Sequence, residues 1–376
     1  MIDTAAEPVR AQRRTVGFLV GLTAVAALIA LIVAPSGSAR VRGSCYGKPA
    51  TITGTKGSDN IKFTAHKDIV DAMRGNDTIE ASSTKTNHGK DIICGGAGHD
   101  KITGNNDDNI LIGGPGNDDV KGGPGDDLVI GDNANPSGPE SGPTGSDTVN
   151  GTGGRDFVVG DNYAEGNTTG ASSDKDVLGI GGPDTVIGDD ASVRGDAMGG
   201  KNDHLAGADG NDLVVGDSYA PKGTASGSGD DAVNAGPGDD VEVGDNYTVT
   251  GRASGGGKDK LAGPDGGDAG VKCKPKDPCD DIFYGDNYVA SCAPNQTPQA
   301  QASNSVIQCE ATRGPGGGAD LLTPDQGNDF MNGGPTNPRD GDIRDDPDRC
   351  SGGPGIDTAT RCHPIKTGAE HFIPYP

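Results

Sequence analysis

Aliphatic residues recur at a fixed interval along the chain, each two places after an aspartate or an asparagine. Between Asp91 and Ile130 this interval is nine residues. The last three residues of each unit suit a short strand, and the six before them suit a turn. We expect the aliphatic side chains to stack into the thin core of a β-solenoid, and they are Ile93, Ile102, Leu111, Val120, Val129, Val149, Val158, Val214 and Val233.

The turn half of each unit follows the pattern Gly-Gly-x-Gly-x-Asp. Four copies stand back to back as GGAGHDKIT, GNNDDNILI, GGPGNDDVK and GGPGDDLVI over residues 95–130. Glycine suits such a turn because it adopts positive φ and lets backbone carbonyls approach closely. Two units make a coil of eighteen residues, so the turns of Asp100 and Asp118 stack on one edge and those of Asn109 and Asp127 on the other. Degenerate copies precede them at residues 54–62 and 72–80.

The period lengthens between residues 131 and 271. A Gly-Asp-Asn-like turn recurs there in steps of 29, 28, 28 and 28 residues. Each period holds two nonapeptide-like units and about ten further residues, which predicts one lateral loop per coil on a common face. The turns begin at Gly131, Gly160, Gly188, Gly216 and Gly244, and the phased pairs are Asp147/Asp156, Asp176/Asp184, Asp203/Asp212, Asp231/Asp240 and Asp259/Asp268.

Several positions depart from the pattern. Glu242 occupies an expected inward position, so either it faces outward or the register slips and Asp239 replaces Asp240 as the functional residue. Gly270 replaces an apolar residue, and residues 181–188 read one residue short. Tyr163, Tyr219 and Tyr247 follow the long-period turns; they form either a binding ladder or a packing layer, and the tendency of aromatic rings to bury area favours packing.

Five segments follow from these shifts in pattern. The first contains three arginines and then an uncharged, largely apolar run ending in Gly-Ser-Ala, which fits a cleaved signal peptide or a retained anchor. Either alternative places the rest outside the cytoplasm, secreted or on the extracellular cell surface. The segments are residues 1–39, the leader; 40–130, nonapeptide repeats; 131–271, long-period coils; 272–313, a cysteine-containing insert and polar loop; and 314–376, degenerate repeats with a disulfide cap.

Composition narrows the class of protein. Only 31% of the residues are hydrophobic and none is tryptophan, so a broad aromatic core is excluded and a solenoid is favoured. The net charge of −24 calls for neutralising cations, and without a basic stripe no nucleic-acid partner is expected. Eight cysteines without a CxxC pair favour disulfides over zinc. Proximity in sequence suggests Cys45–Cys94, Cys273–Cys279, Cys292–Cys309 and Cys350–Cys362 among 105 possible pairings.

The phased nonapeptides resemble those of the haemolysin-type, or repeats-in-toxin (RTX), calcium-binding proteins, most specifically over residues 95–130. The resemblance implies an all-β protein, a calcium-stabilised parallel β-roll with loop-bearing coils of about 28 residues in the middle. It implies that the aspartates of stacked turns and nearby glycine carbonyls bind Ca²⁺. The implied metal residues are Asp100, Asn109, Asp118, Asp127, Asp147, Asp156, Asp203, Asp212, Asp231, Asp240 and Asp259, with Gly95, Gly98, Gly113, Gly116, Gly122 and Gly125. A second tier, with less complete glycine turns, consists of Asp203 and Asp259 from this set together with Asp59, Asp77, Asp320, Asp329 and Asp357.

Calcium takes six to eight oxygen ligands, so two stacked turns are needed for each ion. We therefore expect an extracellular calcium-binding protein that folds when calcium binds. The alternative is a surface adhesin whose lateral loops bind a cell-envelope or glycan partner. Membrane contact is expected only if the leader is retained. The sequence contains no HExxH, G-x-S-x-G or phosphate-binding loop, so catalysis is not expected, and an enzyme with an unrecognised site is the least favoured reading.

Overall fold

The computed structural model describes the chain from residue 43 onward, with gaps. It divides the chain into Met1–Val41 and Arg42–Pro376, and all that follows concerns the second unit. The predicted leader lies outside the described residues, and within them no helix is long and apolar enough to cross a membrane. The described residues are 43–64, 66–81, 89–169, 176–179, 181–262, 282–285, 288–289, 321–323, 330–332, 349–350, 358–360, 363–364 and 371–373.

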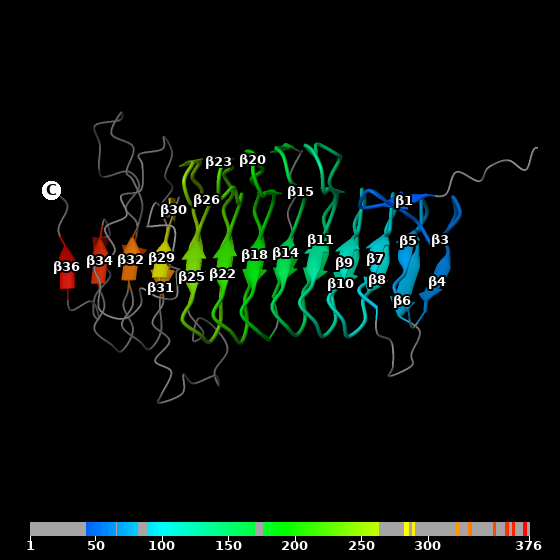
Figure 1. The fold of residues 1–376 in the computed structure, drawn as a ribbon. Coiled ribbons are helices and arrows are strands. Elements are labelled where there is room, and N and C mark those ends of the chain that lie inside the picture. Colours follow the sequence, from blue (N-terminus) through cyan, green and yellow to red (C-terminus); the bar gives the residue numbers. More distant parts are fainter. Residues whose placement is uncertain are drawn as a thin grey trace, which may run out of the picture. The chain divides into compact units, whose positions relative to one another are not determined.

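Two long parallel sheets form the roll, and each coil contributes one strand to each sheet (Figure 1). One sheet has 12 strands: β4 (Asn60–Phe63), β6 (Thr78–Ala81), β8 (Lys101–Thr103), β10 (Asp119–Lys121), β13 (Thr148–Asn150), β17 (Asp176–Leu178), β21 (His204–Ala206), β24 (Ala232–Asn234), β28 (Lys260–Ala262), β31 (Leu321–Thr323), β33 (Arg349–Cys350) and β35 (His363–Pro364). The other has 13: β3 (Ile52–Thr53), β5 (Ile69–Asp71), β7 (Ile92–Cys94), β9 (Ile110–Ile112), β11 (Leu128–Ile130), β14 (Phe157–Val159), β18 (Thr185–Ile187), β22 (Leu213–Val215), β25 (Val241–Val243), β29 (Ile282–Tyr284), β32 (Phe330–Asn332), β34 (Thr358–Thr360) and β36 (His371–Ile373).

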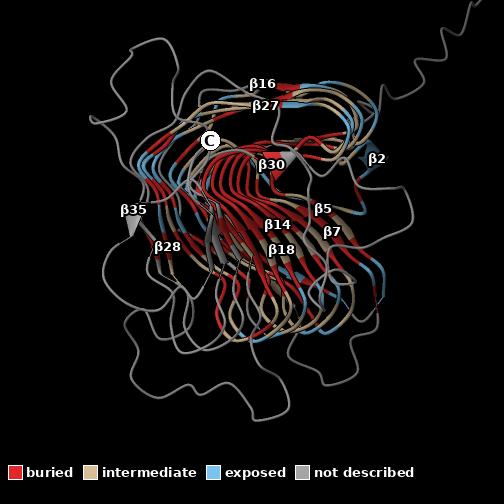
Figure 2. Ribbon diagram, turned by 90° about the vertical axis from the view of Figure 1, so that its left-hand side faces the viewer, coloured by how far each residue is buried: buried red, intermediate tan, exposed pale blue. Residues whose placement is uncertain are grey.

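The register of the strands confirms the predicted coil. Ile102 of β8 pairs with Val120 of β10, and Leu111 of β9 pairs with Val129 of β11, so one coil takes eighteen residues. From β13 to β28 the offset along this sheet is 28 residues, with Val149 opposite Val177 and Val233 opposite Leu261. The predicted parallel β-roll is confirmed. The two sheets enclose one aliphatic stack, which appears as the buried interior in Figure 2. None of the nine aliphatic positions predicted for the core is more than 2% exposed.

The long-period coils carry a lateral layer, as their spacing predicts. Their extra residues form short parallel sheets that continue from coil to coil, one of three strands and one of four. In Figure 2 the β16 and β27 edge lies apart from the two main sheets. The strands are β12 (Ala134–Asn135), β15 (Tyr163–Ala164) and β19 (Ala191–Ser192), then β16 (Thr168–Thr169), β20 (Ala197–Met198), β23 (Thr224–Ser226) and β27 (Arg252–Ser254), and the pair β26 (Tyr247–Thr248) and β30 (Tyr288–Val289).

The tyrosines of the lateral layer pack against the roll. The rings of Tyr219 and Tyr247 stack with their centroids 5.2 Å apart, and Tyr247 is only 4% exposed. Tyr163 joins the same cluster, with its ring edge-on to that of Phe157. The packing interpretation is therefore the one that the structure favours over a binding ladder.

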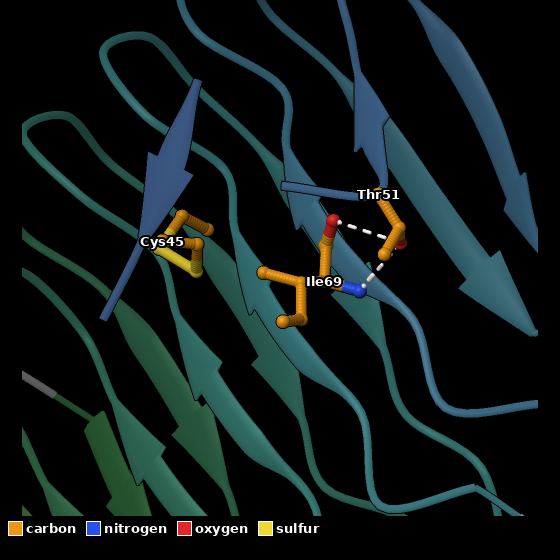
Figure 3. Close-up of a disulfide and its surroundings, with 4 residues drawn as sticks. Cys45, Thr51 and Ile69 are labelled. Carbon is orange, nitrogen blue, oxygen red and sulfur yellow. Dashed lines mark hydrogen bonds between the residues drawn. A yellow bond between two sulfur atoms is a disulfide. The ribbon is translucent and has the colours of Figure 1, made fainter. Parts of the chain in front are cut away.

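A disulfide fastens the N-terminal hairpin to the first coils. Strands β1 (Ser44–Cys45) and β2 (Lys48–Pro49) pair antiparallel, and Cys45 is bonded to Cys94 at the end of β7, as proximity suggested. Figure 3 shows this bond near Ile69, whose N–H donates a hydrogen bond of 2.9 Å to Thr51 Oγ1. The side chains of the three other suggested disulfides lie outside the described residues. Gly270 and Asp268 also lie outside them.

Glu242 corrects one expectation. It lies opposite Val214 and Phe283 in neighbouring strands and is 1% exposed, so its side chain points into the core stack. Neither the outward orientation nor the register slip is correct. The N–H of Ala235 donates a hydrogen bond of 2.8 Å to Glu242 Oε1, which explains how the core accommodates a carboxyl group.

The repeat at residues 181–188 is not short. Asp176 is the first residue of β17 and pairs with Thr148, whereas Asp147 directly precedes the strand that contains Thr148. Asp176 therefore lies one place beyond the position that corresponds to Asp147. A unit measured from Asp176 to Asp184 has eight residues for this reason, although the repeat itself is complete. Thr185 keeps the regular pairing with Phe157.

Candidate metal centre

Aspartates line both edges of the roll, each directly before a strand. We define the first row as the residues that precede strands of the 12-stranded sheet, and the second row as those that precede strands of the 13-stranded sheet. The first row contains Asp59, Asp77, Asp100, Asp118, Asp147, Asp203, Asp231 and Asp259. The second row contains Asp68, Asp91, Asn109, Asp127, Asp156, Asp184, Asp212 and Asp240.

In most of these aspartates, one carboxylate oxygen ties its turn to the preceding coil. The N–H of Asp100 donates to Asp118 Oδ1 at 2.7 Å, and the N–H of Asp118 donates to Asp147 Oδ1 at the same distance. In the second row, the N–H of Asp127 donates to Asp156 Oδ1 at 2.8 Å. These bonds satisfy backbone donors that are buried at the turn, so the rows are part of the framework of the roll.

The second carboxylate oxygen is buried without a donor in several members of both rows. Within the described residues, Oδ2 of Asp100, Asp127, Asp156, Asp184 and Asp212 accepts no hydrogen bond. Buried polar oxygens normally have a partner, and each exception requires an explanation. A cation bound at the turn would supply that partner.

A glycine carbonyl lies next to this oxygen. A Cβ atom built on Gly95 would stand 2.5 Å from Asp100 Oδ2 and 2.6 Å from the carbonyl oxygen of Gly113, one coil further on. A Cβ on Gly113 would likewise stand 2.6 Å from Asp118 Oδ2. The first glycine of each repeat therefore leaves open a small space that carboxylate and carbonyl oxygens approach. Oxygen donors of these two kinds are the ligands that calcium prefers.

The glycine at the fourth position of the repeat serves the stacking of the turns. Gly116 adopts φ 155° and Gly125 adopts φ 144°, conformations that L side chains rarely reach. A Cβ on Gly125 would lie 2.7 Å from the carbonyl oxygen of Asp107, and one on Gly116 would collide with the carbonyl of Gly98. The predicted glycines thus divide into Gly95, Gly113 and Gly122, beside Oδ2, and Gly98, Gly116 and Gly125, where the turns stack closely.

Burial raises the pKa of several row carboxyls. It lifts the pKa of Asp100 to about 6 and that of Asp127 to about 8, the latter with a further contribution from the charge of Asp156. Burial also lifts the pKa of Asp212 to about 8, helped by the charge of Asp184. Each row is a stack of like charges in a poorly solvated place, so the ionised form needs a counter-charge.

Side chains alone do not complete a site. Over the described ranges, no group of three or more His, Cys, Asp and Glu side chains is placed to hold a metal ion. Two carboxylates from stacked coils and the adjacent glycine carbonyls form the donor set that remains. This set consists entirely of hard oxygen ligands, so it fits calcium and disfavours zinc.

The structure brings together the predicted metal residues in two groups. Asp100, Asp118, Asp147, Asp203, Asp231 and Asp259 belong to the first row, and Asn109, Asp127, Asp156, Asp212 and Asp240 to the second. The second-tier residues Asp59 and Asp77 also belong to the first row, whereas Asp320, Asp329 and Asp357 lie outside the described residues. Asp68, Asp91 and Asp184 of the second row were not included among the predicted metal residues. Their shared position, two places before a buried aliphatic residue, was the signal that could have identified them.

The fold and the site together define a class of protein, the parallel β-roll with rows of buried aspartates on both edges. The RTX calcium-binding nonapeptide repeat, as a model of four copies, matches residues 51–79, 86–102, 103–135, 142–162, 199–218, 226–242 and 316–337. The chain therefore contains RTX calcium-binding nonapeptide repeats over these residues, and such repeats imply calcium binding. No curated protein shows significant similarity to the chain.

Proposed function

We propose that this protein is an extracellular calcium-binding β-roll whose coils fold when calcium binds. The observation that carries the proposal is the row of buried Oδ2 atoms that lack a donor, repeated at successive coils. Without a cation, each added coil brings another buried carboxylate next to the last one. With a cation, the same carboxylates hold neighbouring coils together.

The two carboxylate oxygens of a row aspartate, the glycine carbonyls and the aliphatic stack have separate roles in this proposal. Oδ1 of most row aspartates accepts a backbone N–H of the previous coil, and this fixes the spacing of the turns. Oδ2 and the glycine carbonyls are the ligands, and the bound ion supplies the positive charge that the rows lack. The aliphatic stack is one side chain wide per strand, so we infer that it is too thin to offset the repulsion alone.

The expected location of the protein and the expected affinity of its calcium sites both support folding after export. The leader directs residues 40–376 out of the cytoplasm, and secretion is typical of RTX repeat proteins. Extracellular calcium modules bind with dissociation constants on the order of 10⁻⁴–10⁻³ M. At such an affinity the roll stays calcium-free inside a cell, where free calcium is far lower, and folds after export.

Calcium titration followed by far-UV circular dichroism tests the proposal. Residues 40–376, first treated with EDTA, are expected to change from coil to β structure at sub-millimolar to millimolar calcium. Magnesium at the same concentrations is expected to have no effect, because it demands near-octahedral geometry and keeps its waters. A β spectrum in EDTA that calcium leaves unchanged would contradict calcium-driven folding.

The proposal assigns no catalytic residue, because the carboxylates recur at every coil instead of forming one distinct pair. The adhesin alternative stays a prediction. Its most specific support is the lateral layer, where β16, β20, β23 and β27 form a continuous sheet and Met198 is 45% exposed. A cell-envelope or glycan partner would be sought on this layer.

A further inference from the structure

A third row of aspartates runs between the main sheets and the lateral layer. Each member follows the glycine of a long-period turn, at the position where the nonapeptide has its second glycine. The row is continuous, since the N–H of Asp189 donates to the carbonyl of Asp217 at 3.1 Å, and the N–H of Asp217 to that of Asp245 at 2.8 Å. All five side chains are 0% exposed, and they are Asp132, Asp161, Asp189, Asp217 and Asp245.

The third row adjoins the first. A Cβ atom on Gly188 would lie 2.5 Å from Asp203 Oδ2, and Gly188 directly precedes Asp189. Burial raises the pKa of Asp189 well above its usual range, and the charge of Asp203 in the first row raises it further. The long-period coils therefore bring carboxylates of two rows into one buried region.

Asp217 shows most clearly that this region is built for a ligand. Neither of its carboxylate oxygens accepts a hydrogen bond from an N–H or O–H of the described residues. Burial raises its pKa, and so do the carboxyls that face it, those of Asp245, Asp231 and Asp189; Asp245 also shares a side-chain hydrogen bond with it. By contrast, Asp189 Oδ2 accepts the N–H of Lys201 at 3.1 Å.

A backbone oxygen points to the same place. A Cβ atom on Gly216 would collide with the carbonyl oxygen of Gly244 and with Asp231 Oδ2. Gly216 directly precedes Asp217, so carboxylates of the first and third rows and a glycine carbonyl lie around one turn. The arrangement repeats at Gly188, whose Cβ would meet Asp203 Oδ2 and the carbonyl of Gly216.

We propose that the third row forms an additional line of calcium-type divalent-cation sites, outside the nonapeptide turns. Each site would join a third-row carboxylate, a first-row carboxylate and a glycine carbonyl of the next coil, as at Asp217, Asp231 and Gly244. The choice of calcium as the ion rests on the proposed function. Long-period coils then bind more calcium per coil than eighteen-residue coils do.

The test compares two double variants of the full chain. Asp217→Asn with Asp245→Asn removes two charges from the third row and keeps the shape of the side chains. Asp209→Asn with Asp230→Asn removes two exposed charges from the same coils and serves as the matched control. Bound calcium is counted by equilibrium dialysis at saturating calcium. The third-row variant is expected to lose at least one ion per chain, and the control to match the unaltered protein.

An unchanged calcium count in the third-row variant would overturn the proposal and would mean that protons neutralise this row. No calcium bound to the unaltered protein would instead refute the proposed function, so the two failures are distinguishable. If the third-row variant does not regain its β spectrum, terbium-soaked crystals of the unaltered protein decide the matter. We expect anomalous density about 2.3–2.6 Å from Asp217 Oδ atoms. Density at the nonapeptide turns alone would overturn the proposal.

Discussion

The two oxygens of a row aspartate have different tasks, and Asn109 separates them. Asn109 Oδ1 accepts the N–H of Asp91 at 3.1 Å, and its own N–H donates to Asp127 Oδ1 at 2.6 Å, so the framework bonds are kept. Its Nδ2, however, donates to the carbonyl of Asp107 at 2.6 Å, in the place where an aspartate would present a free oxygen. Asparagine therefore preserves the ladder and removes one ligand.

Asn109→Asp is expected to strengthen calcium binding by the second row. The change adds a charged ligand beside Asp127, and ligand charge is one of the features that tune calcium affinity. We expect the calcium midpoint for folding to fall, on the order of tenfold for the affected site. Asn117→Asp adds the same charge at an exposed position of a neighbouring turn and is the control. Equal shifts for both variants would attribute the effect to net charge.

At the scale of elements, the N-terminal hairpin closes the end of the roll. Cys45 is 1% exposed and belongs to the cluster that contains Ile92 and Ile112, so the hairpin covers apolar side chains of the first coils. The disulfide to Cys94 spans 49 residues. An end coil has a neighbour on one side only, so this covalent link stabilises the part of the roll that stacking supports least.

Cys45→Ser with Cys94→Ser is expected to destabilise the first coils by roughly 2–5 kcal/mol, the usual effect of removing a native disulfide. Amide hydrogen exchange in calcium measures the loss, which we expect in β3, β5 and β7. Strands β22 and β25, far along the roll, serve as the internal control. A uniform loss of protection along all strands would contradict a local clamp and would show that the roll unfolds as one unit.

The nonapeptide spacing was sufficient to predict the coil, the core and the two rows. It misplaced Asp176 because the register depends on the strands paired on either side, and Thr148 fixes that register in space. It misjudged Glu242 because the N–H of Ala235 that accommodates the carboxyl is a tertiary contact. It did not single out Asp217, since the burial of that residue arises only when the lateral layer folds over the turn.

At the scale of the molecule, charge couples the coils to one another and to calcium. The chain carries a net charge of −24, and its phased aspartates are buried inside the roll instead of being spread over its surface. Adding a coil extends each row by one carboxylate and also creates the next place for an ion. Folding and calcium binding are then one process that spreads from coil to coil.

Because these carboxyls are buried, the stability of the calcium-free roll is expected to decrease as the pH rises. Burial raises the pKa of Asp127 and Asp212 to about 8, and that of Asp184 to about 7, from the usual value of 3.8. The folded state therefore binds more protons than the unfolded chain. The stability contributed by the protonated carboxyls is fully present below pH 3.8 and is lost as the pH rises toward 8. In EDTA we thus expect more β structure at pH 5 than at pH 8.

Calcium reverses the direction, because it binds the carboxylate form and must displace the proton from each site. The calcium concentration at the midpoint of folding is therefore expected to fall between pH 5 and pH 8. While a site is still protonated, each proton that an ion displaces lowers this midpoint by about tenfold for every pH unit. Circular dichroism at a series of calcium concentrations and pH values measures both trends in one experiment. A midpoint that does not move with pH would show that the rows are already ionised without calcium. The repulsion between their charges would then be too weak to make folding depend on the ion.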